Sequence, residues 1–564
     1  MKARKSGRSL MGAVFFFSVF VNLLMLTGPL FMLQVYDRVL GSRSEETLVA
    51  LFLLVAVMFG FMGVLDYARG RVLARYGAQF QGSLDAPVFR ATMAQAIDPK
   101  KRAKAAMGLR DLDVLQQFFT SPVVLALCDI PWTPLFMVLI FVFHPWLGWL
   151  ALSGALILVI LSLINHFWSR DLTARAQLGV VEASSFANEA RTHAELISAQ
   201  GFGKSMLSRW QHMRRVGVDA VLGAADVTGT SASATKAFRL FLQSAMLALG
   251  AYLVLLGQMT PGAMIAGSIL MGRALAPIEQ SIGSWTLVQS ASQSWTSLGQ
   301  LLVSQTQPEP SVALPRPDAL LVLRNISYQV PDRKAPVLKA INLKITPGEA
   351  IGVIGKSGAG KSSLARMMLG LTAPSTGEVM FGGAHFSQYD RDALGAYIGY
   401  LPQHVTLFPA TIAENIARMS ETPDQEAVIR AAKRADVHDL ITNLPEGYDT
   451  SLGKHDSALS GGQMQRIALA RALYPDPVML ILDEPNSALD ADGTDALNRV
   501  VREFKAAGRA IVLMTHRPMS ITECDRLVVI EEGVIRADGP RDEVLQSMLK
   551  NADQIRQIVS GARS

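Results

Sequence analysis

The sequence predicts a chain of two unlike parts, an all-α bundle of six membrane-spanning helices followed by an α/β domain of the P-loop class. Half of the 564 residues are apolar and only 18% are charged, which is too apolar for a water-soluble protein of this length. Long uncharged runs fill the first half, whereas the second half alternates short apolar strands with polar segments. A proline-rich stretch lies between the two halves.

The uncharged runs supply the six expected spans. A bilayer core needs ~20 residues of helix at a rise of ~1.5 Å each. Residues 9–36 and 47–65 contain no Asp, Glu, Lys or Arg, and each run predicts one span. Residues 130–169 and 240–272 are uncharged over lengths that suit two spans each. Turns at His144-Pro145 and at residues 257–262 divide these runs. We expect the third span to begin near Thr120 and the fourth to end near Asn165.

The distribution of Lys and Arg predicts the orientation. Basic residues precede the first span and recur within residues 66–117 and 170–236. The turns near His144 and Gln258 carry no charge. By the positive-inside rule, both termini face the cytoplasm. The net charge of +6 then suits an anionic membrane surface, and nucleic acid is not an expected partner. We expect the two basic segments to extend the membrane helices beyond the lipid bilayer.

A linker separates the two parts. Residues 305–317 read QTQPEPSVALPRP, and four prolines in a polar stretch are typical of a linker. We therefore expect a membrane domain over residues 1–304, a linker over 305–318 and an α/β domain over 319–564. The two cysteines, Cys128 and Cys524, lie in different regions and predict neither a disulfide framework nor a metal site.

A glycine-rich loop follows the apolar strand expected over residues 350–354. Residues 355–362 read GKSGAGKS and fit the pattern G-x-x-x-x-G-K-[ST]. Its glycines let backbone N–H groups close around phosphate oxygens, helped by the N-terminus of the following helix. Lys361 supplies charge to the β- and γ-phosphates, and Ser362 offers a hydroxyl to Mg²⁺. The expected nucleotide-binding residues are Gly355, Lys356, Ser357, Gly358, Ala359, Gly360, Lys361, Ser362 and Ser363.

Two further strands bring acidic and imidazole groups toward this loop. The apolar run 478–482 ends in Asp483 and Glu484. At the end of a strand beside the loop, Asp483 can hold Mg²⁺ and Glu484 can act as general base on the attacking water. His516 follows the apolar run 510–514 and can contact the γ-phosphate. Together these groups predict binding and hydrolysis of ATP with Mg²⁺.

Several short motifs resemble the nucleotide-binding domain of ATP-binding cassette (ABC) proteins. Residues 459–463 read LSGGQ, the family's signature pentapeptide; Gln403 matches its Q-loop glutamine, and SALD, ending at Asp490, matches its D-loop. The resemblance implies a homodimer in which Leu459, Ser460, Gly461, Gly462 and Gln463 face nucleotide held by the partner. It also implies that Gln403 reaches the metal, with Ser362 and Asp483, and joins Glu484 and His516 in catalysis.

One position departs from the family pattern. ABC proteins usually stack adenine on an aromatic residue of an early strand, where this chain carries Val330. Tyr328 lies two residues earlier on the same strand face, and we expect it to take over that contact. Plain packing of the tyrosine ring is the alternative.

The order of the two parts indicates the kind of ABC protein. Membrane helices followed by the ATPase resemble a half-exporter, and three stretches resemble the PrtD-like exporters of bacterial type I secretion: DIPWTP, LPQHVTLFPATIAENIARM and LILDEPNSALD. This resemblance implies ATP-driven export of an unfolded polypeptide with a C-terminal signal across the bacterial inner membrane. The partners would be a membrane-fusion adaptor and an outer-membrane channel. A half-exporter of lipids or amphiphilic small molecules is the alternative, and the six spans disfavour a soluble ABC ATPase.

Ionisable residues within the spans are candidates for the translocation path. Arg273 falls near the middle of the sixth span, where we expect it to face the dimer cavity, against acidic cargo or Glu279. Asp129 lies in the third span, and we expect it to pair within the bundle. A structural ion pair and a cargo contact stay open for both residues. Arg239 lies near the inner interface and is expected to extend toward the lipid headgroups.

Overall fold

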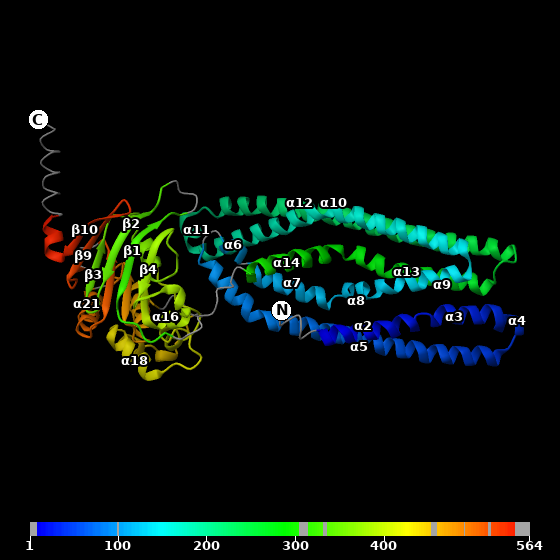
Figure 1. Cartoon of the computed structure of the whole chain (residues 1–564), viewed down its shortest axis with the longest axis horizontal. Coiled ribbons are helices and arrows are strands. Elements are labelled where there is room, and N and C mark those ends of the chain that lie inside the picture. Colours follow the sequence, from blue (N-terminus) through cyan, green and yellow to red (C-terminus); the bar gives the residue numbers. More distant parts are fainter. Residues whose placement is uncertain are drawn as a thin grey trace, which may run out of the picture. The chain divides into compact units, whose positions relative to one another are not determined.

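The structure, a computed structural model, describes residues 8–98, 101–105, 107–303, 314–330, 335–452, 459–489, 491–516 and 521–547. The chain forms two compact units, Met1–Thr306 and Gln307–Ser564 (Figure 1). The first unit holds only helices and turns in its described residues, and the second is an α/β domain. Most of the expected linker, residues 305–318, lies outside the described residues.

Six helices of the first unit are long and apolar enough to cross a membrane, which confirms the predicted number of spans. The first is broken into several short helices, and the third contains a 3₁₀ turn where Pro131 lies. In chain order the spans are α2 (Arg8–Leu24), α3 (Thr27–Gln34), η1 (Val35–Val39) and α4 (Leu40–Ser42) together; α5 (Glu45–Ala96); α8 (Pro122–Asp129), η2 (Ile130–Trp132) and α9 (Thr133–Phe143) together; α10 (Pro145–Thr192); α12 (Gly203–Leu255); and α13 (Pro261–Gly283).

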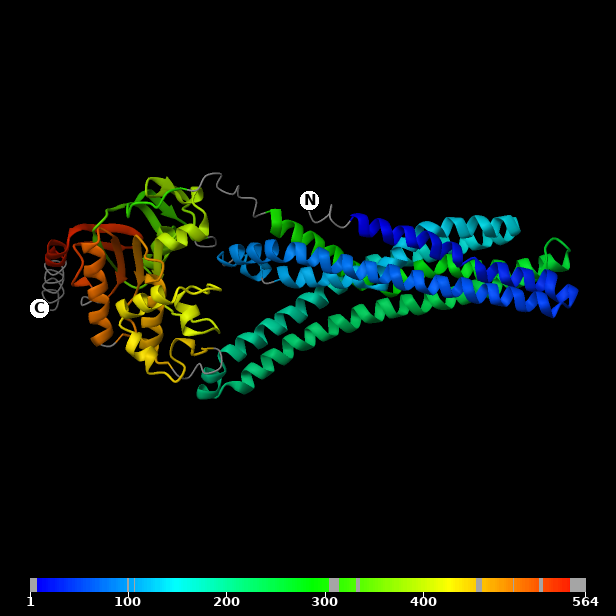
Figure 2. The same ribbon diagram turned by 90° about the horizontal axis from the view of Figure 1, so that it is seen from below.

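Three of these helices are far longer than a bilayer requires. α5, α10 and α12 contain 52, 48 and 53 residues, more than twice the ~20 that span a hydrocarbon core. Their basic halves therefore continue beyond the membrane, as the sequence predicts. Four further helices belong to this extension: α6 (Arg102–Ala105), α7 (Gly108–Thr120), α11 (Ala194–Gln200) and α14 (Trp285–Val303). α10 and α12 pack along each other and diverge from α7 and α14 toward the α11 end (Figure 2).

The expected turns separate the paired spans. The ring nitrogen Nδ1 of His144 accepts a hydrogen bond from the backbone N–H of Trp146 (3.2 Å), with Pro145 at the first position of α10. Thr260 caps α13 in the same way, because its Oγ1 accepts from the N–H of Ala263 (3.2 Å). The carboxylate of Asp37 accepts from the Thr260 hydroxyl (2.6 Å), which joins the ends of the first and sixth spans.

A buried polar network ties the first three spans together. The Arg69 guanidinium on α5 lies 2.9 Å from Oδ1 of Asp129 on α8. Asn22 on α2 donates to the same carboxylate oxygen (2.8 Å), and the Ser18 hydroxyl accepts from Arg69 (3.3 Å). All four side chains are buried. Pairing with several hydrogen bonds is what a charge inside a membrane protein requires. Asp129 therefore pairs within the bundle.

The second unit is built on two β-sheets. One has six strands in the order β10-β9-β3-β8-β7-β6, in which β9, β3, β8, β7 and β6 run parallel; the other has four antiparallel strands in the order β2-β1-β4-β5. The strands are β1 (Leu321–Tyr328), β2 (Leu338–Ile345), β3 (Ala350–Ile354), β4 (Thr376–Phe381), β5 (Ala384–His385), β6 (Ile398–Leu401), β7 (Met479–Asp483), β8 (Ala510–Thr515), β9 (Arg526–Glu531) and β10 (Val534–Pro540).

Helices and the four-stranded sheet cover the six-stranded sheet, so its central strands are buried on both faces. Leu480 and Leu482 of β7 belong to one apolar cluster, whereas Met479 and Ile481 belong to another. This double burial explains why these strands are continuous apolar runs in the sequence. The α-helices of the second unit are α15 (Lys361–Met368), α16 (Arg391–Tyr397), α17 (Ile412–Ile416), α18 (Gln425–Arg434), α19 (His438–Thr442), α20 (Gly461–Leu473) and α21 (Ala491–Ala506).

The buried ion pair of the membrane unit gives a stability prediction. Asp129→Ala leaves the Arg69 charge buried without its main partner, which typically costs about 3–5 kcal/mol. We expect a lower unfolding midpoint for the detergent-solubilised protein, measured by intrinsic fluorescence during heating. Asp66→Asn is the matched control, because Asp66 also contacts Arg69 (2.6 Å) but its side chain is 55% exposed. Equal midpoints for the two variants would show that the buried pair contributes little.

Candidate nucleotide-binding site

A cavity of about 660 Å³ lies at one edge of the six-stranded sheet, where β3, β7 and β8 end. These three strands are neighbours and run parallel, so the residues that follow them meet at that edge. The cavity therefore brings together groups that are more than 100 residues apart in the chain. Its lining consists of Val330, Val337, Ser357, Gly358, Gly360, Lys361, Ser362, Ser363, Gln403, Asp483, Glu484 and His516.

The glycine-rich loop after β3 can adopt its path only with glycines at particular positions. Gly360 has φ +107°, in the left-handed region that other residues rarely enter. At Gly355 a Cβ atom would lie 2.4 Å from the carbonyl oxygen of Ile530, so no larger residue fits. The Lys361 ammonium donates to the carbonyl oxygens of Gly355 (2.6 Å) and Lys356 (3.3 Å), which holds its charge across the loop. α15 starts at Lys361, so its N-terminal N–H groups lie at the cavity.

Asp483 is one of two buried carboxylates that line the cavity, with Glu484. Its side chain ends β7 and is 4% exposed. Burial raises the pKa of this carboxyl above its ordinary value, and a hydrogen bond from Ser362 acts in the opposite direction. Among the described residues, its Oδ1 has no hydrogen-bond partner. An unpaired buried carboxylate oxygen beside a hydroxyl suits one Mg²⁺ whose other ligands are phosphates and water.

The described residues contain no cluster of three or more His, Cys, Asp or Glu side chains that could enclose a metal ion. Mg²⁺ at nucleotide sites does not need such a cluster, because one or two protein oxygens and the phosphates suffice. Ser362, Asp483 and Gln403 all line the cavity, so the expected donor set is assembled there.

Glu484 occupies a strained backbone position. Its φ is +53°, in the left-handed region, which costs a non-glycine residue about 1–3 kcal/mol. The backbone N–H of Glu484 donates to the carbonyl oxygen of Met514 on β8 (2.8 Å). Its carboxylate Oε1 lies 2.7 Å from Nδ1 of His516. This backbone conformation and the contact with His516 position the Glu484 carboxylate at the cavity, where it can accept a proton from water.

Gln465 is a supporting residue that the sequence alone did not reveal. It lies on α20, is 3% exposed, and its amide nitrogen donates to the carbonyl oxygen of Pro485 (2.6 Å). Its amide oxygen accepts from the N–H of Ala488 (3.0 Å). One side chain thus holds both ends of the turn that follows Glu484. The signal in the sequence was a glutamine among the apolar positions of a helix, which also fits an exposed residue.

The signature residues form the N-terminus of α20. The Ser460 hydroxyl accepts from the N–H of Gln463 (3.3 Å), and Oε1 of Gln463 accepts from the N–H of Ser460 (2.8 Å). A Cβ atom on Gly462 would lie 2.8 Å from the carbonyl oxygen of Ala488, so glycine is required there. The five residues 459–463 do not line the cavity of their own chain. Their contact with a partner's nucleotide stays a prediction, and Asp490 lies outside the described residues.

Adenine stacking on Tyr328 also stays a prediction. Tyr328 is half-buried against the apolar cluster of the four-stranded sheet and is not part of the cavity lining. Val330 and Val337 line the cavity instead and offer apolar contacts to a base. Of the loop residues expected to bind nucleotide, Gly355, Lys356 and Ala359 also lie outside the lining.

The ionisable residues of the last spans differ from the expectation. Glu279 does not pair with Arg273, because its carboxylate lies 2.7 Å from the Arg239 guanidinium. Arg239 is thus held in an ion pair between α12 and α13 and does not extend freely toward lipid headgroups. Arg273 is exposed in the single chain, and its place on a translocation path stays a prediction.

The fold and the site together define an ATP-driven membrane transporter. Residues 338–487 match the description "ABC transporter", and residues 11–276 match "ABC transporter transmembrane region". The chain is 39% identical to the type I secretion system ATP-binding protein PrsD of Rhizobium meliloti, over 94% of this chain and 92% of PrsD. It is 30% identical to the leukotoxin translocation ATP-binding protein LktB of Mannheimia haemolytica, over 94% of this chain and 75% of LktB.

The chain therefore belongs to the ABC transporter family, among the ATP-binding proteins of type I secretion systems. It is a multi-pass membrane protein that binds ATP and couples ATP hydrolysis to transport. A solved bacterial Atm1-family ABC exporter with ATP bound has the same fold, with a TM-score of 0.82 and 21% identity over 98% of both chains.

The position of Gln465 predicts its effect on turnover. Gln465→Met keeps the volume but removes both hydrogen bonds to the turn after Glu484. We expect kcat for ATP hydrolysis to fall about 10- to 100-fold, as for a misplaced catalytic group, with little change in KM for ATP. Gln425→Met, at an exposed position on α18, is the control in the same phosphate-release assay. An unchanged kcat for Gln465→Met would show that the turn keeps its shape without the amide.

Proposed function

We propose that this protein exports an unfolded polypeptide with a C-terminal secretion signal across the bacterial inner membrane, as the ABC component of a type I secretion system. The similarity to PrsD over nearly the whole of both chains carries the proposal, because PrsD is named for that system. The names of the LktB proteins, which refer to translocation of a leukotoxin, support a protein as the cargo.

The ATP site has the parts that hydrolysis needs. Lys361 and the N–H groups at the start of α15 would hold the phosphates of ATP. Ser362 and Asp483, with Gln403 nearby, would hold Mg²⁺, which neutralises charge on the phosphates when bound. Glu484 accepts a proton from the attacking water, and His516 orients its carboxylate through the 2.7 Å contact.

The working unit in this proposal is a homodimer. The signature residues 459–463 lie outside the cavity of their own chain and start a helix, whose N-terminus attracts phosphate. Each site would therefore be completed by residues 459–463 of the second copy, with Asp490 nearby. A membrane-fusion adaptor and an outer-membrane channel would carry the cargo onward, and both ends of the chain would face the cytoplasm.

The general-base role of Glu484 can be tested by one substitution. Glu484→Gln keeps the side-chain volume and leaves Lys361 and Ser362 unchanged, so ATP binding should persist. Turnover should fall about 10²- to 10⁴-fold, the usual value of general-base assistance. Binding of a fluorescent ATP analogue and phosphate release are measured on the same preparation. Lys361→Ala serves as the contrast, because it should weaken binding itself. Near-normal hydrolysis by Glu484→Gln would contradict the assignment.

An export assay tests the proposed cargo. Cells carry this protein, an adaptor and outer-membrane channel from one host, and a reporter with a C-terminal secretion signal. We expect reporter in the medium with the unsubstituted protein and none with Glu484→Gln, because export depends on hydrolysis. A reporter without the signal is the second control. Membrane-inserted, ATPase-active protein that exports no reporter would contradict the proposal and favour a lipid or amphiphile as the cargo.

A further inference from the structure

The cytoplasmic end of the second span carries an exposed basic face. On α5 the uncharged run of residues 47–65 is soon followed by residues 67–84, which contain three arginines and no Asp or Glu. Arg69 is buried in the polar network of the first three spans. Arg71 and Arg75 lie on the other side of α5, where both are exposed. Their charges are therefore not part of that network.

A hollow of about 590 Å³ lies over this basic face. The residues that line it all belong to α5: Tyr67, Ala68, Arg71, Val72, Ala74, Arg75 and Ala78. Arg71 and Arg75 are one helical turn apart, so their guanidinium groups can reach the same ligand. The three small alanine side chains leave room for a ligand to approach the helix beside them.

One of the two arginines is held in place, yet most of its donors are unused. Nε of Arg71 donates to the Tyr67 hydroxyl (3.0 Å), and its Cζ lies 5.2 Å from the centre of the tyrosine ring. In the described part of the chain, no carboxylate pairs with Arg71 or Arg75. A guanidinium group matches the oxygens of a phosphate. The basic face thus suits a phosphate that comes from outside the chain.

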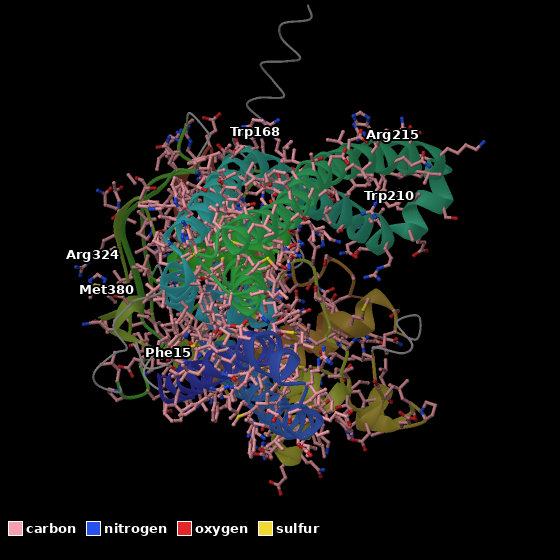
Figure 3. The ribbon with its side chains drawn as sticks, turned by 90° about the vertical axis from the view of Figure 1, so that its right-hand side faces the viewer. Phe15, Trp168, Trp210, Arg215, Arg324 and Met380 are labelled. Carbon is pink, nitrogen blue, oxygen red and sulfur yellow. The ribbon has the colours of Figure 1, made fainter. Side chains whose placement is uncertain are left out.

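The position of this face along the span indicates where the phosphate comes from. Tyr67 is 64% exposed and comes two residues after the uncharged run of α5. α10 repeats the pattern, because Trp168 is 69% exposed near the end of its uncharged run and Arg170 follows. Figure 3 shows Trp168 on the outer surface of the helical unit. Exposed aromatic residues followed by arginine are typical of the level of the lipid headgroups, and the cytoplasmic leaflet is negatively charged.

An apolar strip continues the basic face into the bilayer. Val57, Phe61 and Val64 are 55%, 62% and 66% exposed. With Ala68, Arg71 and Arg75 they recur every three or four residues, so the six side chains form one strip along α5. The strip is apolar within the span and basic at its cytoplasmic end. This order matches a lipid, whose acyl chains and phosphate are joined in the same sequence, whereas a soluble anion has no use for the apolar half.

We infer that Arg71, Arg75 and Tyr67 bind the headgroup phosphate of an anionic phospholipid of the cytoplasmic leaflet, whose acyl chains lie along Phe61 and Val64. The site is separate from the nucleotide cavity and from any contact with cargo. Its test therefore does not depend on the identity of the exported molecule.

Native mass spectrometry of the purified, detergent-solubilised protein tests this site. The protein is titrated with short-chain phosphatidylglycerol, and bound lipid is counted per chain. Arg71→Gln with Arg75→Gln should raise the dissociation constant about 30-fold, because each basic residue at an anionic surface typically contributes about fivefold. Arg110→Gln should leave it unchanged. Arg110 is also exposed, but it lies on α7, roughly 18 Å of chain before the third span starts at Pro122.

Two further variants and a stability measurement complete the comparison. Arg71→Lys with Arg75→Lys keeps both charges and should retain most of the binding. Phosphatidylglycerol should raise the heat-unfolding midpoint of the unsubstituted protein and of the lysine variant, but not of the glutamine variant, since a ligand stabilises the folded state that binds it. Similar midpoints of all variants without lipid would show that each one folds. A glutamine variant that binds phosphatidylglycerol as tightly as the unsubstituted protein overturns the inference.

The other possible occupants of the basic face give different results. Equal binding of phosphatidylcholine, or of inorganic phosphate at the same concentrations, would show that no anionic lipid is selected and overturns the inference. Ala74→benzoylphenylalanine, irradiated in membranes, should cross-link to lipid, because Ala74 lies between the two arginines. Cross-linking to a second copy of this chain in place of lipid would make the face a dimer interface and would also overturn the inference.

Discussion

The nucleotide site depends on the register of three parallel strands. β3, β8 and β7 lie side by side, with Ile354 paired to Thr515 and Asp483 paired to Met514. This alignment places the loop after β3, the carboxylates at the end of β7 and the imidazole after β8 at one edge. A shift of one residue would turn each side chain to the opposite face of the sheet. Burial of β7 and β8 in two apolar clusters fixes the register, so the hydrophobic core positions the catalytic groups.

Local patterns made most of the fold and much of the site predictable. The spans appear as uncharged runs, and the turns at His144 and Thr260 carry prolines and capping groups. Lys361, Ser362, Asp483 and His516 each lie at the end of a strand or start of a helix, so their meeting follows from strand order. The hydrogen bonds of Gln465 and the Arg239–Glu279 pair depend on helix rotation and on contacts between distant segments. No short window of sequence contains that information.

Asp483 and Asp129 are both buried acids, but their surroundings differ. In the α/β unit, Asp483 keeps an unpaired oxygen at the edge where a ligand binds. In the membrane unit, the carboxylate of Asp129 binds Arg69 and Asn22, and these contacts hold three spans together. For these two acids, the unpaired oxygen of Asp483 distinguishes the group that lines the cavity from the group that holds the spans together.

The network around Arg69 also has a consequence for membrane insertion. Arg69 belongs to the second span, but its main partner Asp129 is made sixty residues later. Arg69 is therefore made before Asp129. Until then Asp66, one turn earlier on the same helix, can neutralise the arginine (2.6 Å). When the third span is in place, Arg69 keeps both partners, with Asp66 at 2.6 Å and Asp129 at 2.9 Å. An acidic partner on the same helix lowers the cost of an arginine at the end of a span before the other spans are made.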